Sequence, residues 1–327
     1  MNMRFSIVSC VVVAVLTTGS AADEAARATA TLIFAGDVML AETVGRQIAG
    51  GTDPFADVST FLKTADAAIC NLECVVATTG VPMEGKPFTF RADPGTLPVL
   101  ARHFRIVSLA NNHTGDFGRE AFLEQLGLLR KHGIAWFGGG RNCAEARAPH
   151  VIEIHGVRIA LLGYNDYHPR EFEAGPDWPG IAWAVGAQME ADIKAARSLH
   201  HADVVIPFMH WGLQYVPEND RQRKLARLMI RAGADAVIGG HPHVTQGVER
   251  FRGRLVVYSL GNFVFNGYDD GPSRAGWLLR LRVNKQGIDS WDTMQYHIDD
   301  DGIPHLSGEG PSASSANASG VGKSSRR

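Results

Sequence analysis

Short apolar runs recur along the chain, and turns rich in glycine separate them. Eight runs have the length and composition of buried β-strands, and they occupy residues 31–37, 67–73, 105–113, 134–140, 157–166, 203–212, 235–241 and 254–263. Between several of them, segments such as 118–133 and 217–234 carry apolar residues at helical spacing and stop at a glycine. This alternation of strands and helices predicts an α/β fold with at least some parallel strand pairing.

The pattern changes toward the C-terminus. Residues 276–284 and 288–299 alternate apolar and polar positions with no helix between them, which predicts antiparallel strands. Residues 307–327 are rich in Ser, Gly and Ala without apolar periodicity, so we expect a disordered tail there. We place the folded domain at residues 31–300.

The N-terminus has the features of a secretory signal peptide over residues 1–22. Arg4 precedes an apolar run of 12 residues, and small residues follow it. The run is too short for a comfortable transmembrane helix, and an uncleaved anchor is the alternative. We therefore expect an exported protein, periplasmic or extracellular, that is membrane-anchored if the signal is not cleaved.

The bulk composition is that of a globular protein with ample core material. The chain has 327 residues, 45% of them hydrophobic, and a formal net charge of -2. This balance gives no electrostatic reason to expect a nucleic-acid partner, although it leaves a local basic patch open. Cys70 and Cys74 would lie about 13 Å apart in an extended segment, too far for a disulfide, so we interpret them as buried apolar residues.

Polar side chains follow five of the predicted strands, at the point where each strand ends. Because carboxyl ends of parallel strands form the ligand crevice of an open α/β sheet, we expect these groups to converge. Carboxylate, amide and imidazole groups are the ligand set of Zn, Mn or Fe(II). The residues are Asp37, Glu73, Asn112, His113, His210, His241 and His243.

Each of these residues also has a structural explanation when taken alone. Asp37 could cap the helix expected after it, Glu73 could lie in an exposed turn, and His210 could be a hydrogen-bonded histidine. His241 and His243 are harder to explain this way. In an extended segment they would point to one side about 6.6 Å apart, and Pro242 between them stiffens the loop.

At these residues the chain resembles the CapA family of poly-γ-glutamate capsule proteins, whose domain is metallophosphatase-like. The matching motifs are GDVM, NLE, KPFTFRADP, SLANNHTGDFG, HWG, GGHPHVTQG and YSLGNFVF, in family order over about residues 31–265. The resemblance implies a two-sheet sandwich flanked by helices, the calcineurin-like metallophosphoesterase fold, with its active site at the carboxyl ends of the strands.

The resemblance also implies roles for the residues, because the wider superfamily holds two metals that activate a bridging hydroxide. His113 would be the general acid, oriented by Asp116. Phosphoesterases of this fold usually carry Asp-x-His at the first strand, where this chain has Met39, which weakens one metal site. The implied ligands are Asp37, Glu73 and His243 for that site, and Glu73, Asn112, His210 and His241 for the other.

The leading hypothesis is a CapA-like protein that acts in the synthesis, export or processing of poly-γ-glutamate or a similar anionic polymer, with one or two divalent ions. Lys86 and Arg91 offer cations for the carboxylates of such a substrate, or lie on a solvated loop. A membrane polymer-synthase complex is the partner we expect. The alternatives are a metal-dependent phosphoesterase or amidase of the cell envelope, a metal-free proton-transfer enzyme, and a non-catalytic scaffold that binds the polymer.

Overall fold

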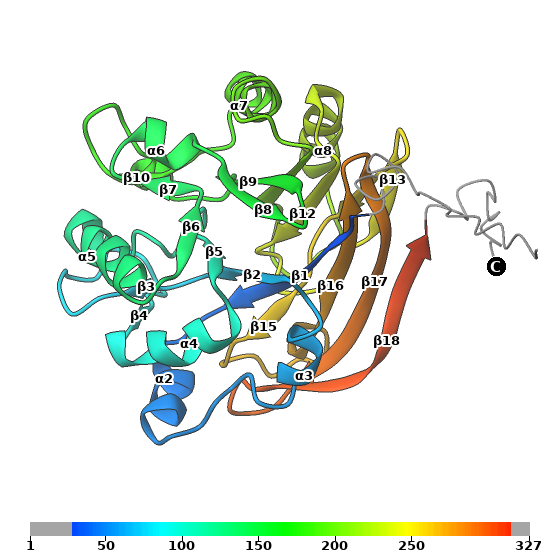
Figure 1. Ribbon diagram of the computed structural model, residues 1–327. Helices are drawn as coiled ribbons and strands as arrows, with labels where there is room; N and C mark the ends of the chain where they lie inside the picture. The colour runs from blue at the N-terminus through cyan, green and yellow to red at the C-terminus, as the bar shows by residue number, and fades with distance from the viewer. Residues whose placement is uncertain (1–27, 315–327) are drawn as a thin grey trace, which may run out of the picture.

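The computed structural model describes residues 28–314 and contains two large β-sheets that pack face to face (Figure 1). The first sheet has the strand order β18-β17-β16-β1-β2-β5-β6, with β15 also paired to β1. Strands β1, β2, β5 and β6 are parallel, whereas β16, β17 and β18 are antiparallel, as predicted for residues 276–299. The strands are β1 (Ala30–Val38), β2 (Ala67–Leu72), β5 (Ile106–Ser108), β6 (Ala135–Phe137), β15 (Asn262–Val264), β16 (Ala275–Asn284), β17 (Gly287–Ile298) and β18 (Pro304–Ser314).

The second sheet has the order β13-β14-β12-β11-β9-β8, and its four inner strands are parallel. Its members are β8 (His150–Ile154), β9 (Val157–Asn165), β11 (Val204–His210), β12 (Ala236–Gly240), β13 (Val248–Phe251) and β14 (Arg254–Val257). Two short pairs complete the strands, namely β3 (Val75–Val76) with β4 (Arg91–Ala92) and β7 (Gly139–Gly140) with β10 (Gly180–Ile181).

Helices cover the outer faces of the sandwich (Figure 1). Those over the first sheet are α2 (Glu42–Ala49), α3 (Ser59–Leu62), α4 (Leu97–His103) and α5 (Gly118–Lys131). Those on the side of the second sheet are α6 (Cys143–Arg147), α7 (Gly186–Ser198) and α8 (Asp220–Ala232). Within residues 28–314, none of the helices has the length and apolar character needed to cross a membrane.

The alternation of side chains along each strand builds the core. In β11, Ile206 and Phe208 point between the sheets, while Val205 and Met209 point toward the helices. Strands buried on both faces read as continuous apolar runs, which is why they were recognisable from the sequence. Cys70 and Cys74 are buried free thiols, as interpreted.

The C-terminal segment differs from the prediction. Residues 307–314, expected to belong to a disordered tail, continue β18 and pair with β17. An edge strand needs only backbone hydrogen bonds, so Ser, Gly and Ala can form one without the apolar periodicity used for the prediction. Residues 1–22 and 315–327, for which a signal peptide and a tail were predicted, lie outside the described residues.

Candidate metal centre

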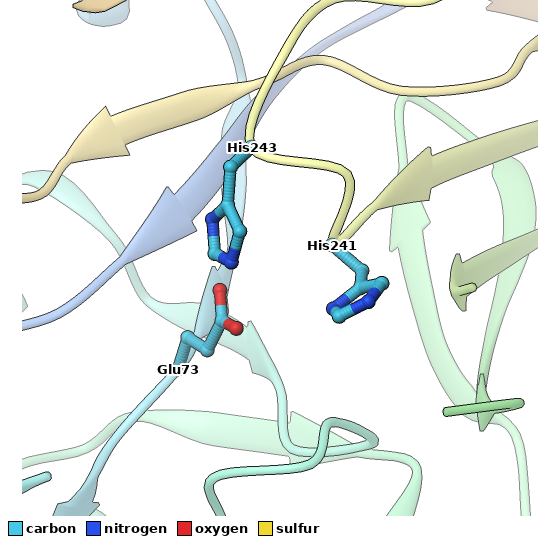
Figure 2. Close-up of side chains that lie close together, drawn as sticks. All are labelled: Glu73, His241 and His243. Carbon is cyan, nitrogen blue, oxygen red and sulfur yellow. The ribbon is translucent and has the colours of Figure 1, made fainter. Parts of the chain in front are cut away.

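The parallel strands of both sheets end at a common edge, and the predicted ligands meet there. Two groups of side chains each place their ligand atoms within 4.8 Å of one another. One is Glu73 with His241 and His243, and the other is Asp37 with Glu73 and His210. Figure 2 shows the His243 ring directed at the Glu73 carboxylate, with His241 beside them. Glu73 belongs to both groups, which is the position that the resemblance implies for a bridging ligand.

Asp37 lies at the end of β1 and is fully buried, so it is no helix cap. The N-cap of α2 is Ala41, and no side chain caps that helix. Oδ1 of Asp37 accepts a hydrogen bond from Asn71 Nδ2 at 2.8 Å, and Oδ2 accepts one from the His241 N–H at 2.9 Å. Burial raises the pKa of Asp37, opposed by the nearby His243 and by these hydrogen bonds. Asp37 therefore connects the first sheet to the histidine loop of the second.

The loop that carries His241 and His243 is not extended, contrary to our expectation. Both residues have positive φ, at 92° for His241 and 60° for His243, a region that non-glycine residues rarely occupy. Their rings still lie 5.7 Å apart, centroid to centroid, and face the same site. Strained backbone of this kind costs on the order of 1–3 kcal/mol per residue and is concentrated at functional sites.

Gly240, directly before this loop, is required by close approach. A Cβ at this position would lie 2.6 Å from Oδ1 of Asp37. Only glycine lets the end of β12 pass this close to the carboxylate, so the glycine pair before the histidines has a direct structural reason.

Glu73 follows β2 and is fully buried, yet neither carboxylate oxygen has a hydrogen-bond partner among the described residues. Burial, together with the neighbouring Asp37, raises the pKa of Glu73 well above its ordinary value. The Nε2 atom of His241 is buried without a partner as well. Buried polar atoms are normally satisfied, and a divalent cation would satisfy all three. The donor set therefore fits a metal of the Zn, Mn or Fe(II) type.

The three histidines are held in the neutral form that metal binding requires. Burial lowers the pKa of His210 and His241 well below the ordinary value, and the neighbouring imidazoles and Lys86 lower it further. Burial also lowers the pKa of His243. Nδ1 of His243 lies 2.8 Å from Oδ1 of Asn262, which leaves Nε2 free toward Glu73. Nε2 of His210 lies 2.7 Å from Oδ1 of Asn112 and 3.1 Å from Nδ1 of His241.

His113 lies beside this cluster with its ring orientation fixed. Its Nδ1 is 2.7 Å from Oδ2 of Asp116, and Phe90 packs against the ring in a tilted arrangement with centroids 4.4 Å apart. Burial lowers the pKa of His113, and Asp116 opposes that effect. With Nδ1 engaged, Nε2 is the nitrogen available for proton transfer, which fits the role that the resemblance implies.

Lys86 and Arg91, both expected to bind substrate, have different surroundings. The Lys86 ammonium is largely buried, forms an ion pair with Asp116, and donates to the Asn112 carbonyl at 2.6 Å. Arg91 is exposed and stacks 4.5 Å over the Phe117 ring. Its guanidinium donates to two backbone carbonyls instead of facing the site. The structure therefore brings Lys86 to the site and leaves Arg91 away from it.

A cavity of about 820 Å³ opens beside these residues. The loop of residues 83–88 forms one wall, and Tyr167, His168 and Gln214 contribute to the rest. Asn112 and His113 reach its surface, so a molecule in the cavity would contact the proposed acid.

Met39 occupies the position where the resemblance to the metallophosphatase-like superfamily leads us to expect a ligand histidine. It is fully buried in the core beneath α2, and its sulfur accepts a hydrogen bond from the Ala41 N–H at 3.2 Å. Its packing role and its soft thioether leave the metal centre with one ligand fewer on the side of Asp37.

Comparison with known proteins decides the family. Residues 31–267 match the family described as bacterial capsule synthesis protein PGA_cap. The chain belongs to this family. It is 31% identical to the PGA biosynthesis protein CapA of Bacillus subtilis over 81% of this chain, and 29% identical to the capsule biosynthesis protein CapA of Bacillus anthracis over 84%. It spans 70% and 66% of the lengths of these two relatives.

A solved structure shows the same fold. The 5'-nucleotidase precursor from Thermus thermophilus superposes with a TM-score of 0.51 at 13% identity, covering 85% of this chain and 56% of that one. The likeness confirms the predicted fold class, a calcineurin-like two-sheet sandwich, and at this identity it concerns the fold alone.

Asn71 and Asn111 were not predicted, although they connect the site internally. Oδ1 of Asn71 accepts a hydrogen bond from Asn111 Nδ2 at 3.0 Å, and Oδ1 of Asn111 accepts one from the His113 N–H at 3.0 Å. Together with the bond from Asn71 to Asp37, they link the metal cluster to His113. An asparagine inside the apolar run of β2 was the available signal, because a polar residue in a buried strand needs partners.

Proposed function

We propose that this protein acts in the synthesis, export or processing of poly-γ-glutamate or a similar anionic envelope polymer, through a metal-dependent hydrolase-type site. Membership of the family and the names of its Bacillus relatives support the polymer. One observation carries the chemistry, namely the buried Glu73 carboxylate without a hydrogen-bond donor among the described residues, surrounded by imidazoles.

The residues fit hydrolysis of an amide bond. Asp37, Glu73, His210, His241 and His243 would hold the metal, which when bound supplies Lewis acidity and a water of lowered pKa. Water adds to the amide carbon, the bond from carbon to nitrogen breaks, and the departing nitrogen takes up a proton. The products are a carboxylic acid and an amine.

His113 would deliver that proton from Nε2, because Asp116 holds Nδ1 and stabilises the protonated ring before transfer. The Lys86 ammonium forms an ion pair with Asp116 and so helps to hold the Asp116 carboxylate against the His113 ring. The cavity next to His113 has a volume of about 820 Å³, so a polymer segment bound in it would contact Asn112 and His113.

The test is incubation of purified protein with poly-γ-glutamate and Mn²⁺ or Zn²⁺, followed by size-exclusion chromatography and quantification of new amines. We expect shorter chains with one new amine per cut, and a loss of at least a hundredfold in the His113→Gln variant. His132→Gln, at the end of α5, is the matched control and should retain full activity. Intact polymer with every metal tested would refute the proposed hydrolysis.

A second candidate, a scaffold that binds polymer without cutting it, is favoured by Met39 in place of a ligand histidine. A knockout strain complemented with His113→Gln separates the two. A scaffold restores surface polyglutamate in full, whereas a hydrolase leaves the amount or length of the polymer altered.

The proposed setting is outside the cytoplasm. It rests on the signal-like residues 1–22 and agrees with an envelope polymer as substrate. Periplasmic fractionation of cells that express the full chain tests it, and retention in the cytoplasm would contradict it. A membrane polymer synthase remains the partner we propose, and co-purification with the full chain is its test.

A further inference from the structure

A basic groove lies outside the metal centre, along helix α8. Its walls enclose about 320 Å³, and the lining residues are Asp220, Arg223, Lys224, Arg227 and Arg231. These positions recur every three or four residues and therefore share one face of the helix. The chain as a whole has a net charge of -2, so a surface with four cations and one carboxylate is a local departure.

The turn between β13 and β14 lies beside this groove, whose lining residues all belong to α8. Phe251 at the end of β13 has three guanidinium groups around its ring, at 5.4 Å for Arg227, 5.3 Å for Arg231 and 5.8 Å for Arg252. The ring brings cations from a helix and from a hairpin turn together, and α8 and β13 lie next to each other (Figure 1). Such stacking uses the face of a guanidinium and leaves its in-plane N–H donors free for an anion.

The cations of the groove fall into two sets. Arg223 is paired with Glu218 at 2.7 Å and lies 3.9 Å from Glu249, and Arg227 is paired with Glu249 at 3.1 Å. Lys224, Arg231 and Arg252 form no ion pair within the described part of the chain, and all three are exposed. An exposed cluster of unpaired cations is costly by mutual repulsion and favours an anionic ligand.

The groove begins close to the metal centre. Helix α8 starts directly after the loop that carries Tyr215, whose ring lies over His243 with centroids 6.1 Å apart. Arg221 in its first turn pairs with Asp166, which precedes the cavity residue Tyr167. The 13 residues of α8 extend roughly 18 Å from there.

We propose that the groove between α8 and the β13–β14 turn binds a strand of carboxylate-bearing polymer whose cleaved or processed end lies in the metal centre. This inference rests on the proposed function and adds the path that the substrate takes. Guanidinium groups bind carboxylates through two parallel hydrogen bonds.

Binding of fluorescently labelled poly-γ-glutamate, measured by anisotropy in 50 mM salt and EDTA, tests the inference. The variant combines Lys224→Glu, Arg231→Glu and Arg252→Glu, and we expect at least tenfold weaker binding. A matched control with the same change of charge, Lys63→Glu, Lys131→Glu and Lys285→Glu, uses exposed lysines from other elements and should change affinity less than twofold. Equal weakening by both triples would overturn the proposal, because it would show a general effect of charge.

Two further arms keep the test decisive. A charge-removing triple, Lys224→Gln, Arg231→Gln and Arg252→Gln, should weaken binding at least threefold with an unchanged melting temperature. A single-stranded oligonucleotide and vesicles of equal parts phosphatidylglycerol and phosphatidylcholine are competitors. If either binds the wild type more tightly than polyglutamate does, and through these residues, the assignment of a carboxylate polymer is wrong.

Failure of this inference is separable from failure of the proposed function. Glu73→Gln should abolish hydrolysis and leave groove binding within twofold of the wild type. Binding without any hydrolysis would overturn the proposed function alone. If the protein hydrolyses polyglutamate and the groove variants bind it as tightly as the wild type does, only the proposal about the groove is wrong.

Discussion

Replacing Glu73 with Gln separates metal binding from the stability of the metal-free protein. Glu73 is fully buried, and its carboxylate has no hydrogen-bond donor among the described residues. An unsatisfied buried group costs about 1–3 kcal/mol, and more when it is charged. Glutamine has nearly the same shape without the charge. We therefore expect Glu73→Gln to raise the free energy of unfolding by about 1 kcal/mol in EDTA.

With metal bound, we expect the wild type to be more stable than Glu73→Gln. A cation present at 100 times its dissociation constant stabilises the folded protein by about 2.7 kcal/mol. For a chain of this size, that corresponds to an increase of about 5 °C in melting temperature. The wild type should show this increase with Mn²⁺ or Zn²⁺, and Glu73→Gln should show less than about 1 °C because both ligand groups lose their shared member.

Differential scanning fluorimetry with EDTA and with each metal measures both effects. Glu84→Gln, an exposed glutamate on the cavity loop, is the matched control and should behave as the wild type does. A variant that melts lower than the wild type in EDTA, yet gains as much from metal, would refute the reasoning about Glu73.

Three other substitutions test the surroundings of the site. Gly240→Ala places a Cβ 2.6 Å from Oδ1 of Asp37, so we expect at least tenfold weaker metal binding by calorimetry; unchanged affinity would show that the loop adapts freely. Burial alone would raise the pKa of Glu124, but hydrogen bonds from the backbone and side chains of Thr78 and Thr79 outweigh it and lower this pKa to about 2. Its stabilisation is complete above the ordinary value of 4.5 and lost as pH falls toward 2. Solvent screens this carboxylate, so Glu124→Gln should cost about 1 kcal/mol in urea unfolding at pH 7 and progressively less in acid; a cost independent of pH would contradict this. His305, at the start of β18, has a pKa raised by hydrogen bonds to two carboxylates. The stabilisation it provides is complete below its ordinary pKa of 6.5 and lost as pH rises through the higher folded value. His305→Gln should lower stability by under about 1 kcal/mol at pH 5 and not at pH 9, and equal loss at both would exclude an ionic role.

The sequence predicted the strands because their burial on both faces leaves continuous apolar runs. It predicted the site because parallel strands deliver their terminal residues to one edge, as they do for Asp37, Glu73 and His210. It failed at β18, where backbone pairing with β17 forms a strand from a segment with few apolar side chains. Patterns of burial contain no signal for such a strand.

Contacts between segments distant in sequence were also beyond the pattern. Lys86 was expected to meet a substrate, and its partner Asp116 becomes visible only when the 83–88 loop folds over His113. The positive φ of His241 was equally hidden, because the pattern of residue types does not reveal the backbone conformation of a single non-glycine residue. The residue types indicated which ligands and acids the site contains, whereas only the fold shows which of these side chains are free to bind a metal or a substrate.

Elemental analysis of the purified full chain tests the central claim most directly, namely that the buried carboxylates and imidazoles form a metal centre. We predict one or two equivalents of Mn, Zn or Fe per chain, and less than a tenth of that in a variant combining His241→Ala with His243→Ala. Wild-type protein that remains metal-free after incubation with each ion, and retains full activity on its polymer, would contradict the account.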